Sequence, residues 1–239
     1  MTYAIQDLTG KMPTPDKIWS AIWKWDLSKQ IRSYLWKNLH NAYKIGSLWS
    51  RIPNMEHCDR CIYCGESESM ERITIECPDS PAIKAIWKLA ECLWLKHETS
   101  WPMICFGTIL GSGLVDFKTD RGKKHQGKNC LFEILVTESA YLIWKLHCEN
   151  VIKSEGNPER FHPPAEIHNR CVAQINHCLH LDTLSTSKRL HGKNAVTQQL
   201  VLQTWSRVLK DEDSLLDNWI WQQGVLVGIP SHRPLGQNR

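Results

Sequence analysis

The chain has 239 residues, of which 42% are hydrophobic and 23% are charged, and its formal net charge is +4. This composition excludes wholesale disorder and predicts one generous domain or two small ones. The net charge alone is too small to indicate a nucleic-acid partner, so the distribution of charge along the chain has to decide that question.

The ten cysteines would suggest a disulfide framework in a small secreted protein. The first residues, however, show no basic stretch followed by an apolar one, and no later segment has the apolar length of a membrane span. We therefore expect an intracellular protein, nuclear or cytoplasmic, without a membrane partner. Its cysteines are then expected to be metal ligands or small buried residues rather than disulfides.

Two helices are predicted before the cysteine-rich segment. Trp19, Ile22 and Trp23 recur at helical spacing after Pro15, which indicates the first helix. The stretch Asp26-Leu27-Ser28 offers an N-cap for the second helix. Most of the twelve tryptophans are expected to be core anchors, because a tryptophan at helical spacing is usually buried.

The second of these helices has an apolar side and a basic, aromatic side. From Ser28 to Arg51 the chain carries five Lys or Arg and no Asp or Glu. Such a run is usually a solvated surface, and the alternative is a face that binds a phosphate backbone. The candidate nucleic-acid-binding residues are Lys29, Arg32, Trp36, Lys37 and Lys44.

Residues 54–81 are polar and bear cysteines, which is typical of a loop that a metal nucleates. Cys61 and Cys64 are separated by two residues and followed by Gly65, so both thiolates can reach one metal around a tight turn. Cys77 follows thirteen residues after Cys64. A tetrahedral zinc site needs a fourth ligand, and the alternative is a decayed site with free thiols.

The remaining elements are also predicted to be helical. We expect helices over residues 83–95, 131–152, 163–181 and 197–210, with residues 131–152 as the central helix. Prolines and glycines between the helix over residues 83–95 and the helix over residues 131–152 predict a domain boundary near residue 100. The chain is thus predicted to be all-α, with a zinc-knuckle-like loop between its N-terminal helices. Its predicted parts are residues 1–100, residues 101–229 and a disordered tail over residues 230–239.

Other groups of reactive residues carry no catalytic prediction. Glu133, Glu138 and Glu149 lie on or near the central helix without converging in sequence on one cleft, so ion pairs or solvent exposure explain them. We therefore expect no catalytic residue and no small-molecule substrate. A second group is assigned to packing or surface positions: Cys148, Cys171, Cys178, His147, His168, His177 and His180.

The segment from Trp19 to Trp87 resembles the zinc-binding module that follows the reverse transcriptase and RNase H domains in non-LTR retrotransposon polyproteins. The residues that carry this resemblance are Tyr34-Leu35-Trp36, Cys61, Cys64, Glu68, Arg72, Cys77 and Ile86-Trp87. Residues 138–144 and 224–229 also resemble the C-terminal tails of such polyproteins. The resemblance therefore extends over most of the chain.

One position departs from the family pattern. Arg72 stands where the family has a histidine ligand, and a guanidinium that stays protonated cannot coordinate zinc. Cys58 or His57 lies close enough in sequence to supply the missing ligand. Zinc in such a closed site would be structural, because no coordination position stays open for water.

The resemblance implies a non-catalytic accessory module that binds RNA or DNA. It also implies contacts with other domains of a retroelement polyprotein. The alternative is a helical protein-interaction module or a structural remnant that binds neither nucleic acid nor zinc. Nucleic-acid binding and protein interaction differ in salt dependence. Only binding to phosphates releases counterions, so only nucleic-acid affinity falls steeply as the salt concentration rises.

Overall fold

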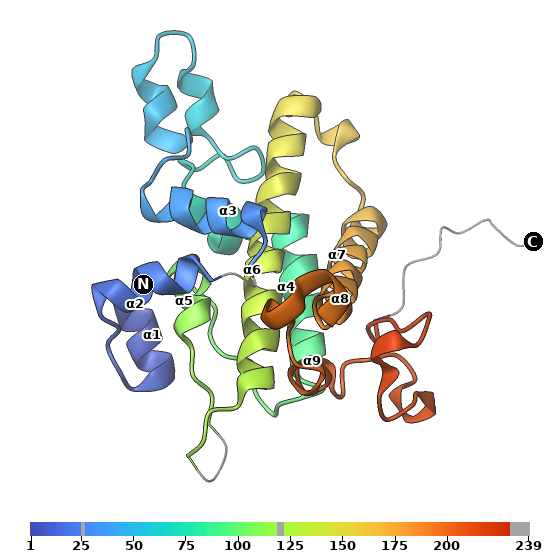
Figure 1. The fold of residues 1–239 in the computed structure, drawn as a ribbon. Coiled ribbons are helices and arrows are strands. Elements are labelled where there is room, and N and C mark those ends of the chain that lie inside the picture. Colours follow the sequence, from blue (N-terminus) through green and yellow to red (C-terminus); the bar gives the residue numbers. More distant parts are fainter. Residues whose placement is uncertain (25–26, 119–121, 230–239) are drawn as a thin grey trace, which may run out of the picture.

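A computed structural model describes residues 1–24, 27–118 and 122–229, and the chain is mostly helical over these residues (Figure 1). The longest helix, α6 (Gln126–Cys148), runs through the centre of the fold. Its residues Leu131, Phe132 and Leu135 are fully buried, as the nearly continuous apolar sequence predicted. The helix starts earlier than predicted because the His125 side chain accepts a hydrogen bond from the Lys128 amide and caps it.

Three further helices pack against α6 or one another: α4 (Pro81–Trp94), α7 (Pro164–Ser185) and α9 (Gln198–Trp205). Both α4 and α7 begin with a proline, whose fixed φ suits the first helical turn. Helix α9 is shorter than the predicted 197–210. The chain turns away at Arg207, which has φ 67°, and residues 208–210 then bond the backbone of residues 226–228.

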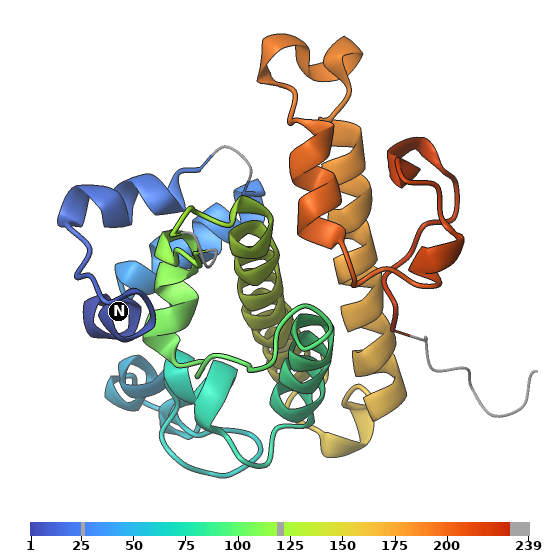
Figure 2. The same ribbon diagram turned by 90° about the horizontal axis from the view of Figure 1, so that it is seen from below.

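The N-terminal helices are α1 (Thr2–Thr9), α2 (Pro15–Ile22) and α3 (Lys29–Leu39), and a short α5 (Phe106–Gly111) packs on α1. Figure 2 shows α1, α2 and α5 on one side of α6, with α7 and α9 on the other. The predicted helices before the cysteines are thus confirmed, and α1 is an additional one. Ser28 caps α3 by accepting a hydrogen bond from the Ile31 amide at 3.2 Å.

The hydrophobic core extends across residue 100. One cluster of buried side chains contains Ile5, Trp94, Phe132, Trp205 and Val227. Helix α4, on one side of that position, packs against α6 and α7, on the other. The division into residues 1–100 and 101–229 remains a prediction, and the two parts share this core.

The segments between the long helices contain short helical turns and, within the described ranges, only isolated β-bridges. None of the described helices combines the length and the apolar character needed to cross a membrane. The predicted tail over residues 230–239 and the predicted capping position Asp26 lie outside the described residues. The short helices are Gly46–Arg51, Glu56–Asp59, Arg72–Glu76, Ser112–Leu114, Glu149–Lys153, Pro158–Arg160, Lys188–His191, Gly192–Asn194, Glu212–Ser214 and Trp219–Trp221.

Candidate functional site

Cys61 and Cys64 lie on a tight turn between α3 and α4. The Cys61 amide donates to the Glu66 carbonyl at 2.8 Å, and the Gly65 amide donates to the Cys61 carbonyl at 2.9 Å. Gly65 has φ 72°, which a residue with a side chain rarely adopts. This turn, at the position of the predicted knuckle, brings the thiols of Cys61 and Cys64 within 4.8 Å of each other.

Cys77 completes a group of three thiols. It follows a π-helical turn, Arg72–Glu76, and its amide donates to the Arg72 carbonyl at 3.0 Å. The three sulfur atoms lie within 4.8 Å of one another, and those of Cys61 and Cys77 are 3.7 Å apart. Two sulfurs each about 2.3 Å from a tetrahedral zinc ion would be about 3.8 Å apart. The Cys61–Cys77 distance therefore matches a shared zinc ion, and the three cysteines together could hold a metal ion.

Two hydrogen bonds hold this loop on the helical core. The Trp87 indole of α4 donates to the Thr74 carbonyl at 2.8 Å and so fixes the turn that leads to Cys77. Asn150, just after α6, donates to the Tyr63 hydroxyl at 2.7 Å. Tyr63 is one of the two residues between Cys61 and Cys64, so this bond anchors the knuckle itself.

The residues considered for the fourth ligand position lie apart from this group. Among the described side chains, the set close enough to share a metal contains Cys61, Cys64 and Cys77 and neither Cys58 nor His57. Those two contact each other, with 3.4 Å between the Cys58 sulfur and the His57 Nε2. Arg72, which stands where the resemblance leads one to expect a histidine, instead donates to the Cys64 sulfur at 3.6 Å.

The surroundings of Cys64 and Cys77 shift the pKa values of their thiols in opposite directions. A backbone hydrogen bond from Glu66 is the main cause that lowers the pKa of the Cys64 thiol, and contacts with Cys61, Cys77 and Arg72 act in the same direction. Burial raises the pKa of the Cys77 thiol to about 12. Without a metal, Cys64 is therefore the better nucleophile of the two, and a bound cation would favour the thiolate form of both.

A histidine from the central helix borders the same site. His147 lines a cavity of about 10 Å³ together with Cys61 and Cys77. Its side chain is 9% exposed, and its Nε2 lies 3.3 Å from the buried Glu68 Oε1. The sequence assigned His147 to a packing or surface position, because nothing in the spacing of residues connects it to a cysteine so distant along the chain.

The predicted basic face lies on α3 and the segment after it. Lys29, Trp36, Lys37 and Lys44 are exposed and Arg32 is partly exposed. Figure 1 shows the chain continuing from α3 into a protrusion that carries the two short helices before the knuckle.

An aromatic group extends this face onto α2. The Trp36 ring stacks on the His40 ring at 4.2 Å, and the Trp19 ring lies 5.4 Å from the same His40 ring. Trp19 is 42% exposed and Trp36 is 38% exposed. The sequence singled out Trp36 and missed Trp19, because the helical spacing of Trp19 is equally typical of a core residue.

The three glutamates near α6 do not form one acidic site. Glu133 pairs with Lys24 at 2.8 Å, and Glu149 pairs with Arg170 at 2.7 Å. Glu138 is 9% exposed and accepts a hydrogen bond from Gln174 at 2.9 Å. Glu133 and Glu149 are thus in ion pairs, as predicted, whereas Glu138 is neither paired nor exposed but buried and hydrogen-bonded.

Glu138 makes the stability of the fold depend on pH. Burial raises the pKa of Glu138 from 4.5 to about 7, so between these values the folded chain holds a proton that the unfolded chain releases. Stability is then lost as the pH rises through this range. We expect Glu138→Gln to be more stable than the parent by about 2 kcal/mol at pH 8 and equally stable near pH 4.5. Urea unfolding at both pH values measures this, with exposed Glu71→Gln as the control.

The second group of cysteines and histidines forms no comparable cluster in the part of the chain that the structure describes. Cys171 and Cys178 are buried in the core, and burial raises the pKa of both thiols. Both are thus packed in the core, one of the two placements that the sequence predicted, and Cys178 also forms a hydrogen bond with Glu138.

Comparisons with protein-family profiles, with curated proteins and with solved structures found no match to this chain.

Proposed function

We propose that this chain is a non-catalytic module that binds RNA or DNA, of the kind that follows the reverse transcriptase and RNase H domains in non-LTR retrotransposon polyproteins. The observation that carries the proposal is the surface of α3, which bears Lys29, Arg32 and Lys37 on the same helix as the Trp36 ring, and this ring forms an aromatic group with His40 and Trp19. Cationic side chains contact phosphates without regard to sequence, and exposed rings stack on bases. The combination suits a single strand best.

The proposed role of zinc is to hold the loop after α3 in one conformation. Cys61, Cys64 and Cys77 supply three ligands, and we assign the fourth position to His147, which also lies outside this group of ligand atoms but borders the same cavity, so its ring has to move toward the sulfurs when a metal binds. Glu68 Oε1 lies 3.3 Å from His147 Nε2 and has no hydrogen-bond partner of its own, so it is placed to accept the bond that a ligating histidine commonly donates to a carboxylate through its second nitrogen. Such a site has no open position, so the metal contributes stability rather than chemistry.

A triple substitution on α3 tests the nucleic-acid proposal. We expect Lys29→Ala, Arg32→Ala and Lys37→Ala together to weaken binding of a single-stranded oligonucleotide by about tenfold or more, and to reduce the slope of log affinity against log salt by about 2. Fluorescence anisotropy at several salt concentrations measures both quantities.

The matched control removes the same number of positive charges elsewhere. Lys188, Arg189 and Lys193 are exposed on the segment after α7, and their triple alanine variant should bind nearly as the parent does. Equal affinity of the parent and the α3 variant would contradict the proposal. Equal weakening of the two variants would also contradict it, since net charge rather than a defined face would then explain the binding.

Exposed tryptophans on α2 and just after it favour one alternative function, a module that binds another protein. Trp19 is 42% exposed and Trp23 is 58% exposed, and large apolar side chains at a surface often mark a protein contact. A helical module that docks on a neighbouring polyprotein domain would use this surface. Its affinity would depend little on salt, so the titration described above distinguishes the two functions.

A further inference from the structure

Three thiols of this chain lie close enough together to react with one another. Cys61, Cys64 and Cys77 are free thiols, and their sulfurs lie within 4.8 Å of one another. The Cys61 and Cys77 sulfurs are 3.7 Å apart, whereas the two sulfurs of a disulfide are about 2.05 Å apart. A disulfide therefore requires an approach of about 1.7 Å, a distance within the reach of side-chain rotation.

The fold holds these thiols together whether or not a metal is present. The turn that carries Cys61 and Cys64 is bonded to Asn150, and the turn before Cys77 is bonded to Trp87. Asn150 follows α6 and Trp87 lies on α4, so both supports belong to the helical core. The three sulfurs therefore stay adjacent in the metal-free chain, where they can react with one another.

The three sulfurs differ in their access to solvent. Cys61 is 5% exposed and Cys77 is 2% exposed, whereas Cys64 is half-buried. The Cys64 sulfur also lies 3.6 Å from the Arg72 guanidinium, which donates to it. A reagent from solvent therefore meets Cys64 first, with a cationic hydrogen-bond donor beside the reacting sulfur.

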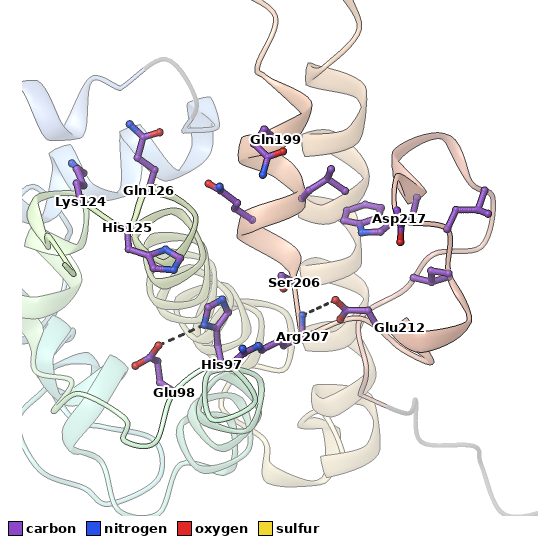
Figure 3. A pocket seen from close by; sticks show the side chains of 15 residues that line it. His97, Glu98, Lys124, His125, Gln126, Gln199, Ser206, Arg207, Glu212 and Asp217 are labelled. Atoms are coloured by element: carbon purple, nitrogen blue, oxygen red, sulfur yellow. Dashed lines mark hydrogen bonds and ion pairs between the residues drawn. The ribbon is translucent and has the colours of Figure 1, made fainter. Parts of the chain in front are cut away.

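The space beside the two buried thiols admits only a small reagent. The cavity next to Cys61 and Cys77 measures about 10 Å³, close to the volume that one water molecule needs. A cleft of about 860 Å³ near His97 has room for a larger ligand, but no cysteine lines it (Figure 3). Hydrogen peroxide is a two-electron oxidant not much larger than water, so it suits the cysteine group.

We propose that Cys61, Cys64 and Cys77 form a redox site, which hydrogen peroxide enters at Cys64 and in which it joins two of the three thiols in a disulfide that excludes zinc. In the first step the Cys64 sulfur attacks one oxygen of the peroxide, the O–O bond breaks, and a sulfenic acid and one water form. In the second step the sulfur of Cys61 or Cys77 attacks the Cys64 sulfur, and the sulfenic hydroxyl leaves as a second water. Two thiols thus lose two electrons and two protons, and one peroxide is reduced to two waters.

The disulfide changes what the site can bind. Zinc is held by thiolates, and the disulfide leaves only one of the three thiols. One thiol and His147 are too few ligands for a structural zinc site, so oxidation and metal binding exclude each other. This exclusion rests on the proposed function of the metal, whereas formation of the disulfide does not. A thiol reductant reverses the reaction and restores the ligands.

The test treats the full, zinc-free chain with an equimolar amount of hydrogen peroxide, blocks the remaining thiols by alkylation and maps the products by mass spectrometry. We expect a disulfide between two of the three cysteines, and dithiothreitol should remove it. Cys92 is the internal control, because its thiol is exposed but lies outside the group. It should stay available for alkylation.

Variants test the order of the two steps. Cys64→Ser leaves a pair of buried thiols, so formation of the disulfide should be slower by about tenfold or more. Cys58→Ser is the matched control, because Cys58 is near in sequence but lies outside the group, and it should react at the parent rate. Circular dichroism verifies that both variants keep the helical fold.

A zinc-loaded sample tests the exclusion of the metal. Peroxide should release the zinc in step with formation of the disulfide, and a chromogenic chelator measures the released ion. The oxidised chain should then bind zinc at least about 100-fold more weakly than the reduced chain. Equal zinc affinity of the oxidised and the reduced chain would overturn the exclusion.

Two results would overturn the redox site itself. One is that the zinc-free parent forms no disulfide within the group, whether or not Cys92 reacts. The other is formation of the disulfide at the parent rate in Cys64→Ser. Failure of the proposed function is seen separately, because oligonucleotide binding and zinc binding are measured on the reduced chain. A reduced chain that binds no zinc would overturn the metal's proposed role, and the zinc-free sample would still decide whether the disulfide forms.

Discussion

Replacing Trp94 by Ala is expected to destabilise the fold by about 3–5 kcal/mol. Trp94 is 1% exposed, and its ring centroid lies 6.0 Å from that of Trp101, 5.1 Å from Phe117 and 5.3 Å from Phe132. Its indole also donates to the Ser100 carbonyl at 2.8 Å. The substitution removes this packing and leaves a cavity between α4 and α6. Thermal unfolding should show a midpoint lower by roughly 10 °C.

Trp221→Ala is the matched control, because Trp221 is 57% exposed and its loss should change stability by at most about 0.5 kcal/mol. The shape of the transition adds a test of the predicted boundary near residue 100. Trp94 and Phe132 lie on opposite sides of residue 100 in one buried cluster. The whole chain should therefore unfold in a single transition, and Trp94→Ala should lower the midpoint of that transition. Two transitions, with only one of them shifted, would contradict a shared core. An unchanged midpoint would contradict the packing role of Trp94.

Much of the fold could be predicted where apolar spacing and a capping residue agree. Ser28 and Ser80 cap α3 and α4 by accepting hydrogen bonds from the amides three residues later, and Pro81 and Pro164 mark the first turns of α4 and α7. Local sequence determines these starts. The end of α4 was predicted within one residue, whereas α7 extends to Ser185, four residues beyond its predicted end.

Two differences between the predicted and the observed helices, the additional α1 and the early end of α9, have identifiable causes. Helix α1 is eight residues long, a length at which a helix depends on tertiary contacts rather than on its own sequence. Its Ile5 is buried against the segment that carries Gly111, which is far along the chain. Helix α9 ends early because residues 208–210 bond to residues 226–228. Neither effect is visible in a local window of sequence.

The candidate site also has one part that the sequence predicted and another part that only the folded chain shows. The interval between Cys61 and Cys64 and the later Cys77 predicted one thiol group, and the three sulfurs do lie together. His147 could not be connected to them, because α6 approaches the loop only in the folded chain. The cleft near His97 had no sequence signal, since its lining comes from separate segments and matches no motif.

Replacing Cys77 by Ser is expected to abolish zinc binding at neutral pH. Structural zinc sites bind with about 10–16 kcal/mol over four ligands, so the loss of one thiolate weakens binding by at least about 100-fold, which leaves the site empty at a zinc concentration that only just saturates the parent. Cys77 is also 2% exposed at the point where the loop joins α4, so loss of the metal should release the loop from the core. Native mass spectrometry of the zinc-loaded parent should show one bound ion, and the variant should show none.

Cys58→Ser is the matched control, because Cys58 lies outside the group of three sulfurs and its loss should leave one zinc ion bound. Cobalt substitution adds a readout of the ligands, since thiolate ligands give intense charge-transfer absorption that falls as each sulfur is removed. His147→Gln should retain this absorption and bind the metal more weakly, because it removes a nitrogen ligand and no sulfur. Zinc binding that survives Cys77→Ser, or that Cys58→Ser abolishes, would show that a different set of ligands holds the metal. A parent that binds no zinc would remove the metal from the proposed function and leave the hydrogen bonds of Trp87 and Asn150 as the supports of the loop.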